Sequence, residues 1–161
     1  MPSLGRHLPG FGYHEVIVET PEHKPPQGVL PESQWRKVLQ MYLRRFRALS
    51  SVDDRMRQVV LFRNHGRRAG TSLMHPHSQI VAIPVVAPET RRRFAEEIEY
   101  FDSTGDCGIC QTLAKELAAR ERVVRRTDRF ITLAPYAARV PFHMQVIPRR
   151  HSAAFNEIQD G

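Results

Sequence analysis

The chain has 161 residues, a formal net charge of +7 and 41% hydrophobic residues, the composition of a soluble globular protein with one core or two small ones. No apolar run is long enough for a membrane span. The N-terminus lacks the basic and then apolar pattern of a signal peptide, so we expect a cytoplasmic protein with no membrane partner.

Arginine supplies almost all of the positive charge. This charge suits a polyanionic partner, and a phosphate-bearing small molecule meets that description as well as nucleic acid does. The basic runs at 44–47 and 91–93 lie in segments with a helical pattern, where such side chains are usually solvated. Because no nucleic-acid motif or aromatic platform is evident, we expect a phosphorylated small molecule and no nucleic acid.

The first elements are predicted from hydrophobic periodicity. Residues 13–20 are rich in β-branched side chains and end before Pro21, which predicts a strand that closes into a turn. Residues 57–63 predict a second strand. Between them, residues 32–49 predict an amphipathic helix whose apolar stripe packs on a sheet. That stripe consists of Trp35, Val38, Leu39, Tyr42, Leu43 and Phe46.

The segment 64–72 follows the second strand and contains two glycines and several hydrogen-bond donors. Glycine permits close approach of the backbone to a ligand, and arginine and hydroxyl groups suit phosphate oxygens. This segment is therefore a candidate anion-binding loop.

The run from His75 to Gln79, His-Pro-His-Ser-Gln, comes just before the apolar residues 80–84. On an extended strand alternate side chains share a face, so His75, His77 and Gln79 are expected on one side. Pro76 cannot donate to a sheet ladder, which favours the start or edge of a strand, where a site can be open to ligand. Histidines near strand ends are often plain surface groups, but two imidazoles and an amide on one face of a strand favour a catalytic or binding site.

The second part of the chain begins with a predicted helix at 88–104. Residues 107–120 are also expected to be helical, 123–133 to form two short extended segments around Asp128, and 142–148 to form another strand. The two cysteines form one Cys-x-x-Cys motif, which is typical of half a metal site or of a redox pair. No thioredoxin-like unit surrounds it, so we favour metal.

The segments 14–23 and 142–151 each place a proline turn and then a histidine at the tenth position, which suggests an internal repeat. Structural zinc takes four ligands, and neither part of the chain supplies four. This inventory predicts a chain that lacks segments at both ends. The incomplete sets are His23 and His75 in the first part, and Cys107, Cys110 and His151 in the second.

The segment from Asn64 to Gln79 combines Asn-x-Gly, Gly-x-Ser and His-Pro-His-x-Gln. It resembles the active-site segment of galactose-1-phosphate uridylyltransferases and related sugar-nucleotide phosphorylases, in the histidine triad superfamily. The resemblance extends to the turn at His23 and to residues 107–155. It implies an α+β fold, with a histidine-triad-like antiparallel sheet and flanking helices in residues 1–104 and a partial second copy in 105–161.

The resemblance also implies a function, a nucleotidyltransferase that acts on nucleoside diphosphate sugars and sugar 1-phosphates, most like UDP-glucose:hexose-1-phosphate uridylyltransferase. A sugar-nucleotide phosphorylase of the ADP-glucose type and an inactive nucleotide-binding remnant are the alternatives. Thr71 and Leu73-Met74 depart from the uridylyltransferase pattern, so base and sugar specificity stay open. A homodimer is implied too, because the active site of the family lies at a subunit interface.

Specific residues carry over from the family motif. By resemblance, His77 is the nucleophile that forms a nucleotidyl-histidine. The substrate-binding residues would be Asn64, Gly66, Ser72 and Gln79, and the zinc ligands would be His23 and His75 in one set and Cys107, Cys110 and His151 in the other.

Overall fold

The computed structural model describes residues 10–23, 30–71 and 73–158. The chain divides into two compact units, residues 1–87 and residues 88–161. Each unit contains one three-stranded antiparallel sheet together with helices. The α+β fold class is therefore confirmed, and the two units are described separately.

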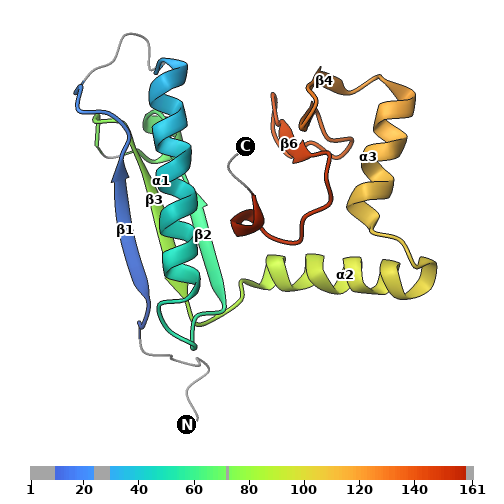
Figure 1. Cartoon of the computed structure of the whole chain (residues 1–161), viewed down its shortest axis with the longest axis horizontal. Coiled ribbons are helices and arrows are strands. Elements are labelled where there is room, and N and C mark those ends of the chain that lie inside the picture. The colour runs from blue at the N-terminus through green and yellow to red at the C-terminus, as the bar shows by residue number, and fades with distance from the viewer. Residues whose placement is uncertain (1–9, 24–29, 72, 159–161) are drawn as a thin grey trace. The chain divides into compact units, whose positions relative to one another are not determined.

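Unit 1 is a sheet with one helix along one of its faces (Figure 1). Strands β1 (Tyr13–Val18), β2 (Gln58–Phe62) and β3 (His77–Ile83) pair in the order β1-β3-β2, so β3 is central. Helix α1 (Glu32–Ser50) connects β1 to β2 and packs on the sheet, as its apolar stripe predicts. A single 3-10 turn, η2 (Arg67–Ala69), lies in the loop between β2 and β3.

The core of unit 1 lies between α1 and the sheet, and it includes Ile17, Val38, Tyr42, Leu49 and Ile80. The assignment of Leu39 to this core is wrong, because its side chain is 54% exposed. Successive helical residues are about 100° apart, and the buried stripe that runs through Val38 and Tyr42 leaves Leu39 outside it.

Strand β3 separates the core from an open face of the sheet. Ser78, Ile80 and Ala82 are buried, whereas the residues between them are half-buried on the opposite face. The strand begins at His77, so the expected alternation holds for His77 and Gln79 but His75 lies in a bend before the strand. Pro76 has no N–H for the ladder, although its carbonyl accepts a hydrogen bond from the Glu19 N–H at 3.0 Å.

Unit 2 begins with helices α2 (Pro88–Thr104) and α3 (Gly108–Ala119). Helix α2 contacts α3, where Glu97 and Tyr100 lie close to Gly108. The division between the units falls at 87/88, whereas the sequence predicts a domain boundary at 104/105. The difference is α2, which groups with the second unit because of these contacts.

The sheet of unit 2 consists of β4 (Val123–Arg126), β5 (Phe130–Leu133) and β6 (Gln145–Pro148), with β5 central. Strand β6 begins later than the predicted residue 142, because Phe142 has a φ of 61°, a left-handed conformation that an extended strand does not accommodate. A 3-10 turn, η3 (Phe155–Glu157), follows β6. Among the described residues, no helix has both the length and the apolar composition needed to cross a bilayer.

Candidate functional site

A cavity of about 320 Å³ lies in unit 1, between the loop that follows β2 and the segment that leads into β3. This volume is at the lower end of the range of about 300–1,000 Å³ for small-molecule sites. The antiparallel pairing of β2 with β3 brings the two segments to the same end of the sheet. Among the predicted site residues, the cavity is lined by His23, Asn64, Gly66, His75 and His77.

The imidazole of His77 has a defined hydrogen-bond partner. Its Nδ1 lies 2.8 Å from the backbone oxygen of His75. A carbonyl oxygen only accepts, so Nδ1 carries the hydrogen and donates it. In the neutral ring Nε2 therefore keeps its lone pair, and this is the nitrogen that remains for a substrate.

The histidines at positions 23 and 75 meet at the same cavity. Their Nδ1 atoms are 3.2 Å apart, and Nε2 of His75 donates to the backbone oxygen of Thr20 at 2.7 Å. A metal-ligating histidine commonly donates its other ring N–H to a carbonyl in this way. Two nitrogens bound to one tetrahedral zinc ion are about 3.3 Å apart, since each Zn–N bond is about 2.0–2.1 Å. The pair fits half of a zinc site.

A buried carboxylate contacts Arg63, one of the residues that line the cavity. Glu19 is 0% exposed and forms an ion pair with Arg63, whose Nε lies 2.8 Å from Oε1. It also accepts hydrogen bonds from Ser78 Oγ at 2.5 Å and from the Tyr42 hydroxyl at 3.1 Å. Burial raises the pKa of Tyr42, which keeps the phenol protonated as a donor. Sequence analysis missed Glu19, because an acidic residue just after a strand looks like a surface group.

The cavity has further polar side chains, namely Arg63, which the sequence did not single out, and Arg67 and Thr71 of the candidate anion-binding loop. Arg63 and Arg67 line it and bring positive charge. Thr71 lines it as well, and its buried Oγ1 has no hydrogen-bond partner among the described residues. An anionic ligand would supply an acceptor for that hydroxyl and a partner for the guanidinium groups.

Gln79, another predicted substrate-binding residue, is not among the described residues that line the cavity. Gln79 lies further along β3, where its Oε1 accepts a hydrogen bond from His14 Nε2 at 2.9 Å. Its strand neighbours are Val16 and Phe62, which are exposed on the open face of the sheet. Ser72 falls outside the described residues.

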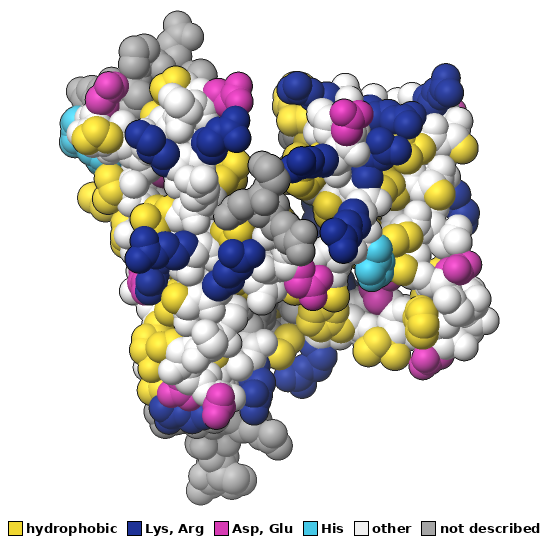
Figure 2. Space-filling view, in the orientation of Figure 1, with side chains coloured by type: hydrophobic (Ala, Val, Ile, Leu, Met, Phe, Trp, Pro, Cys, Tyr) yellow, Lys and Arg dark blue, Asp and Glu magenta, His cyan; other side chains and the backbone are white. Residues whose placement is uncertain are grey.

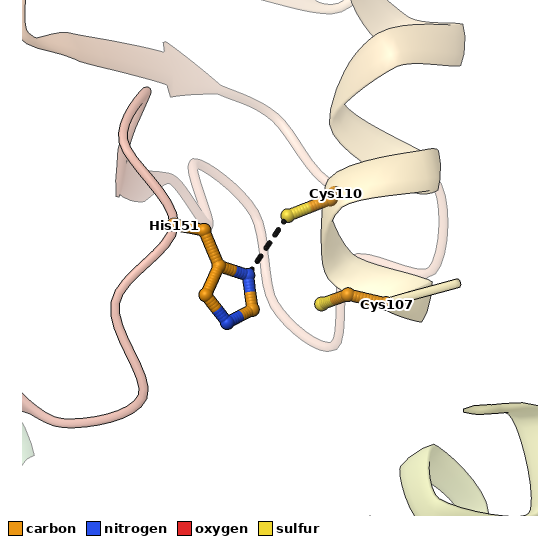
Figure 3. Close-up of side chains that lie close together, drawn as sticks. All are labelled: Cys107, Cys110 and His151. Atoms are coloured by element: carbon orange, nitrogen blue, oxygen red, sulfur yellow. Dashed lines mark hydrogen bonds between the residues drawn. The ribbon is translucent and has the colours of Figure 1, made fainter. Parts of the chain in front are cut away.

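The predicted ligands of unit 2 come together in space (Figure 3). The ligand atoms of Cys107, Cys110 and His151 all lie within 4.8 Å of one another, and Cys110 Sγ is 3.2 Å from His151 Nδ1. Cys107 precedes the first residue of α3, Cys110 lies in its first turn, and His151 follows β6. Both cysteines are free thiols.

The chemistry of this trio suits zinc. Burial and the neighbouring Cys107 thiol raise the pKa of Cys110, and a bound cation would favour its thiolate. Three sulfur and nitrogen donors fit three corners of a tetrahedral zinc site. No other such group of three or more potential ligands occurs among the described residues.

The described basic side chains occur on both units of the chain. On the face visible in Figure 2, lysine and arginine side chains occur in several groups, with acidic and apolar side chains between them. A continuous basic track along the surface is typical of nucleic-acid backbone binding.

Comparison with known proteins shows which proteins this chain resembles. Residues 12–86 match a family model described as the N-terminal domain of a domain of unknown function, DUF4931. An ADP-glucose phosphorylase from Arabidopsis thaliana is 32% identical over 99% of this chain and 44% of that protein. A galactose-1-phosphate uridylyltransferase from Thermotoga maritima is 32% identical over 91% of this chain and 45% of that protein.

Solved structures agree with these relatives. An Arabidopsis thaliana protein described as similar to galactose-1-phosphate uridylyltransferase superposes with a TM-score of 0.84 at 31% identity, covering 98% of this chain and 51% of that one. An ADP-glucose phosphorylase from the same plant, with bound ADP-glucose, gives 0.82 at 31% identity, covering 93% and 47%. The chain thus spans about half the length of the relatives that it matches. Over nearly all of its length the chain is similar to galactose-1-phosphate uridylyltransferases and to an ADP-glucose phosphorylase, the proteins whose active-site segment its residues from Asn64 to Gln79 resemble.

Proposed function

We propose that this chain transfers a nucleotide from a nucleoside diphosphate sugar by way of a covalent intermediate on His77. The observation that carries the proposal is the hydrogen bond from His77 Nδ1 to the His75 oxygen, because it leaves Nε2 as the nucleophilic nitrogen. His77 also lines a cavity that contains two arginines, which suits a phosphate-bearing substrate.

The reaction would proceed in two displacements. The Nε2 lone pair of His77 attacks the α-phosphorus, forming an N–P bond, and the bond from that phosphorus to the bridging oxygen breaks. The sugar 1-phosphate leaves with the electron pair. A phosphate oxygen of the second substrate then attacks the same phosphorus and releases Nε2. Splitting one displacement into two in this way predicts ping-pong kinetics.

The residues around His77 would hold the phosphates and the nucleoside. Arg63, Arg67 and the hydroxyl of Thr71 are the donors that line the cavity. Gln79 lies on the open face of β3, next to exposed apolar residues of β1 and β2, and this face would take the part of the substrate that extends beyond the cavity. Asn64 and Gly66 would contribute from the loop.

Two acceptors are candidates for the second displacement. A hexose 1-phosphate would make the chain a uridylyltransferase-like enzyme. Inorganic phosphate would make it a phosphorylase that releases a nucleoside diphosphate. The second candidate is supported by the similarity of the Arabidopsis ADP-glucose phosphorylase to 99% of this chain.

Zinc would have a structural role in this function. His23 and His75 would hold one ion beside the catalytic segment, and Cys107, Cys110 and His151 would hold another in unit 2. A bound ion would cross-link segments that are distant in the sequence and fix the orientation of the imidazoles. The family resemblance further implies a homodimer, which light scattering on the purified protein would detect.

The test is intact-mass spectrometry after incubation with UDP-glucose or, separately, ADP-glucose. Wild-type protein should gain the mass of one nucleotidyl group, which is a nucleoside monophosphate less one water, and the preferred sugar nucleotide identifies the base. His77→Ala should gain nothing, whereas His65→Ala, a change to another histidine at the cavity, should keep most of the adduct. Equal labelling of wild type and His77→Ala would contradict the proposal, as would a folded wild type that never labels.

The same adduct distinguishes the two acceptors. After removal of free sugar nucleotide, addition of galactose 1-phosphate or of inorganic phosphate should restore the unlabelled mass. The faster of the two identifies the acceptor. Discharge by neither would contradict the second displacement.

A further inference from the structure

The residues on both sides of His77 are held by one buried residue. The Glu19 N–H donates to the backbone oxygen of Pro76 at 3.0 Å, and Ser78 Oγ donates to the Glu19 carboxylate at 2.5 Å. Pro76 and Ser78 are the chain neighbours of His77. Glu19 thus contacts the catalytic strand immediately before and immediately after the proposed nucleophile.

A second contact reaches His77 by way of the residue after Glu19. The backbone oxygen of Thr20 accepts from His75 Nε2 at 2.7 Å, and the backbone oxygen of His75 accepts from His77 Nδ1 at 2.8 Å. His75, whose backbone oxygen sets the tautomer of His77, is therefore hydrogen-bonded to Thr20, the residue that follows Glu19.

The carboxylate of Glu19 is fixed from three different elements. Tyr42 lies on α1, Arg63 follows β2, and Ser78 lies on β3. All three donate hydrogen bonds to the Glu19 carboxylate, and the Tyr42 hydroxyl also contacts the Ser78 hydroxyl. Arg63 lines the same cavity as His77, so one buried group holds both a cationic lining residue and the catalytic strand.

Stability alone is a poor explanation for such a group. Replacing a buried ion pair with well-packed apolar side chains is often neutral or stabilising, whereas a fixed geometry around a reacting atom has a direct effect on rate. We propose that Glu19 is a positioning residue for His77, which holds the backbone of residues 75–78 so that the imidazole keeps the Nδ1–H tautomer and its orientation toward the substrate. This inference rests on the proposed nucleotidyl transfer.

The test is Glu19→Gln, which keeps the size of the side chain. The amide nitrogen of glutamine would face at least one of the donors that converge on the carboxylate, so the network cannot form fully. The matched control is Glu116→Gln in unit 2. Glu116 is also buried, and it pairs with Arg122 through two hydrogen bonds at 3.0 and 2.9 Å.

Two readouts go beyond stability. The first is the single-turnover rate of adduct formation over a range of sugar-nucleotide concentrations. Glu19→Gln should lower the maximal rate by about 10- to 100-fold, with a much smaller change in the half-saturating concentration, because displacement of a reacting group by about 1 Å can cost 100-fold. The second is the ¹⁵N spectrum of the His77 ring, which should show the Nδ1–H tautomer in wild type and a mixture in Glu19→Gln. Glu116→Gln should alter neither.

The proposal is overturned if folded Glu19→Gln keeps both the wild-type rate and the wild-type ring spectrum. If Glu19→Gln does not fold, Ser78→Ala takes its place, since it keeps the carboxylate and removes its link to β3 together with the contact between Ser78 and the Tyr42 hydroxyl. A wild type that forms no adduct would refute the proposed function. The ring spectra of wild type and variant would then decide the positioning role alone, with an unchanged tautomer refuting it.

Discussion

The substitution Ile80→Ala should destabilise unit 1 by about 3 kcal/mol. Ile80 is 0% exposed and lies at the centre of β3, paired with β1 on one side and β2 on the other. Removing three buried carbons costs about 2.4 kcal/mol at about 0.8 kcal/mol each. The residual cavity adds to this, within the range of about 2–5 kcal/mol observed for such changes.

Fluorescence of Trp35 during urea unfolding measures this effect. Trp35 is the single tryptophan of the chain and packs against the core that contains Ile80. With a slope of about 1.5 kcal/mol per molar urea, the midpoint should fall by about 2 M. Leu39→Ala is the control, since this side chain is largely exposed and its loss should change stability by less than about 0.5 kcal/mol. Equal shifts for the two variants would refute the assignment of the core.

Three further predictions concern acid stability, metal and substrate. Arg55 lowers the pKa of Asp53 from 3.8 to about 2, so the unfolded chain takes up this proton at higher pH than the folded chain. The stabilisation is therefore complete above about pH 4 and lost as the pH falls toward 2. Asp53→Asn should flatten that part of a plot of unfolding free energy against pH. An unchanged slope would contradict the prediction. Zinc should raise the melting temperature of the wild type, and EDTA should reverse the increase; Cys110→Ser should show a smaller increase, because only the pair His23 and His75 would still hold an ion. His14→Ala should raise the half-saturating sugar-nucleotide concentration about fivefold through the loss of one hydrogen bond to Gln79, whereas His14→Gln, which keeps a donor, should not.

Much of the fold was predictable because its signals are local. The β-branched run before Pro21 and the three-and-four spacing from Trp35 to Phe46 depend only on neighbouring residues, and β1 and α1 occur where they indicate. The errors arise where backbone conformation overrides pattern. Phe142 takes a left-handed conformation and delays β6, and Pro76 delays β3 until His77.

The residues of the candidate site also fall into those that a local sequence signal reveals and those that it does not. The segment from Asn64 to Gln79 is continuous in the sequence, so its residues could be singled out together. Glu19 could not be, because its burial depends on a tyrosine 23 positions away and a serine 59 positions away. No local pattern reports such distances, and only the packing of α1 and β3 on the end of β1 makes this carboxylate part of the site.

Because side chains alternate along β3, the strand cannot shift its register against β1 by even one residue without loss of both the core and the site. His77 and Ser78 are adjacent, yet one faces the open side of the sheet and the other faces the core. A slip of one residue against β1 would exchange the two faces, burying an imidazole and exposing Ile80 to water. Packing of the apolar side chains in the core thus fixes the register of β3, and with it the position of His77 on the open face. The hydrogen bond between Ser78 and Glu19 fixes the same register.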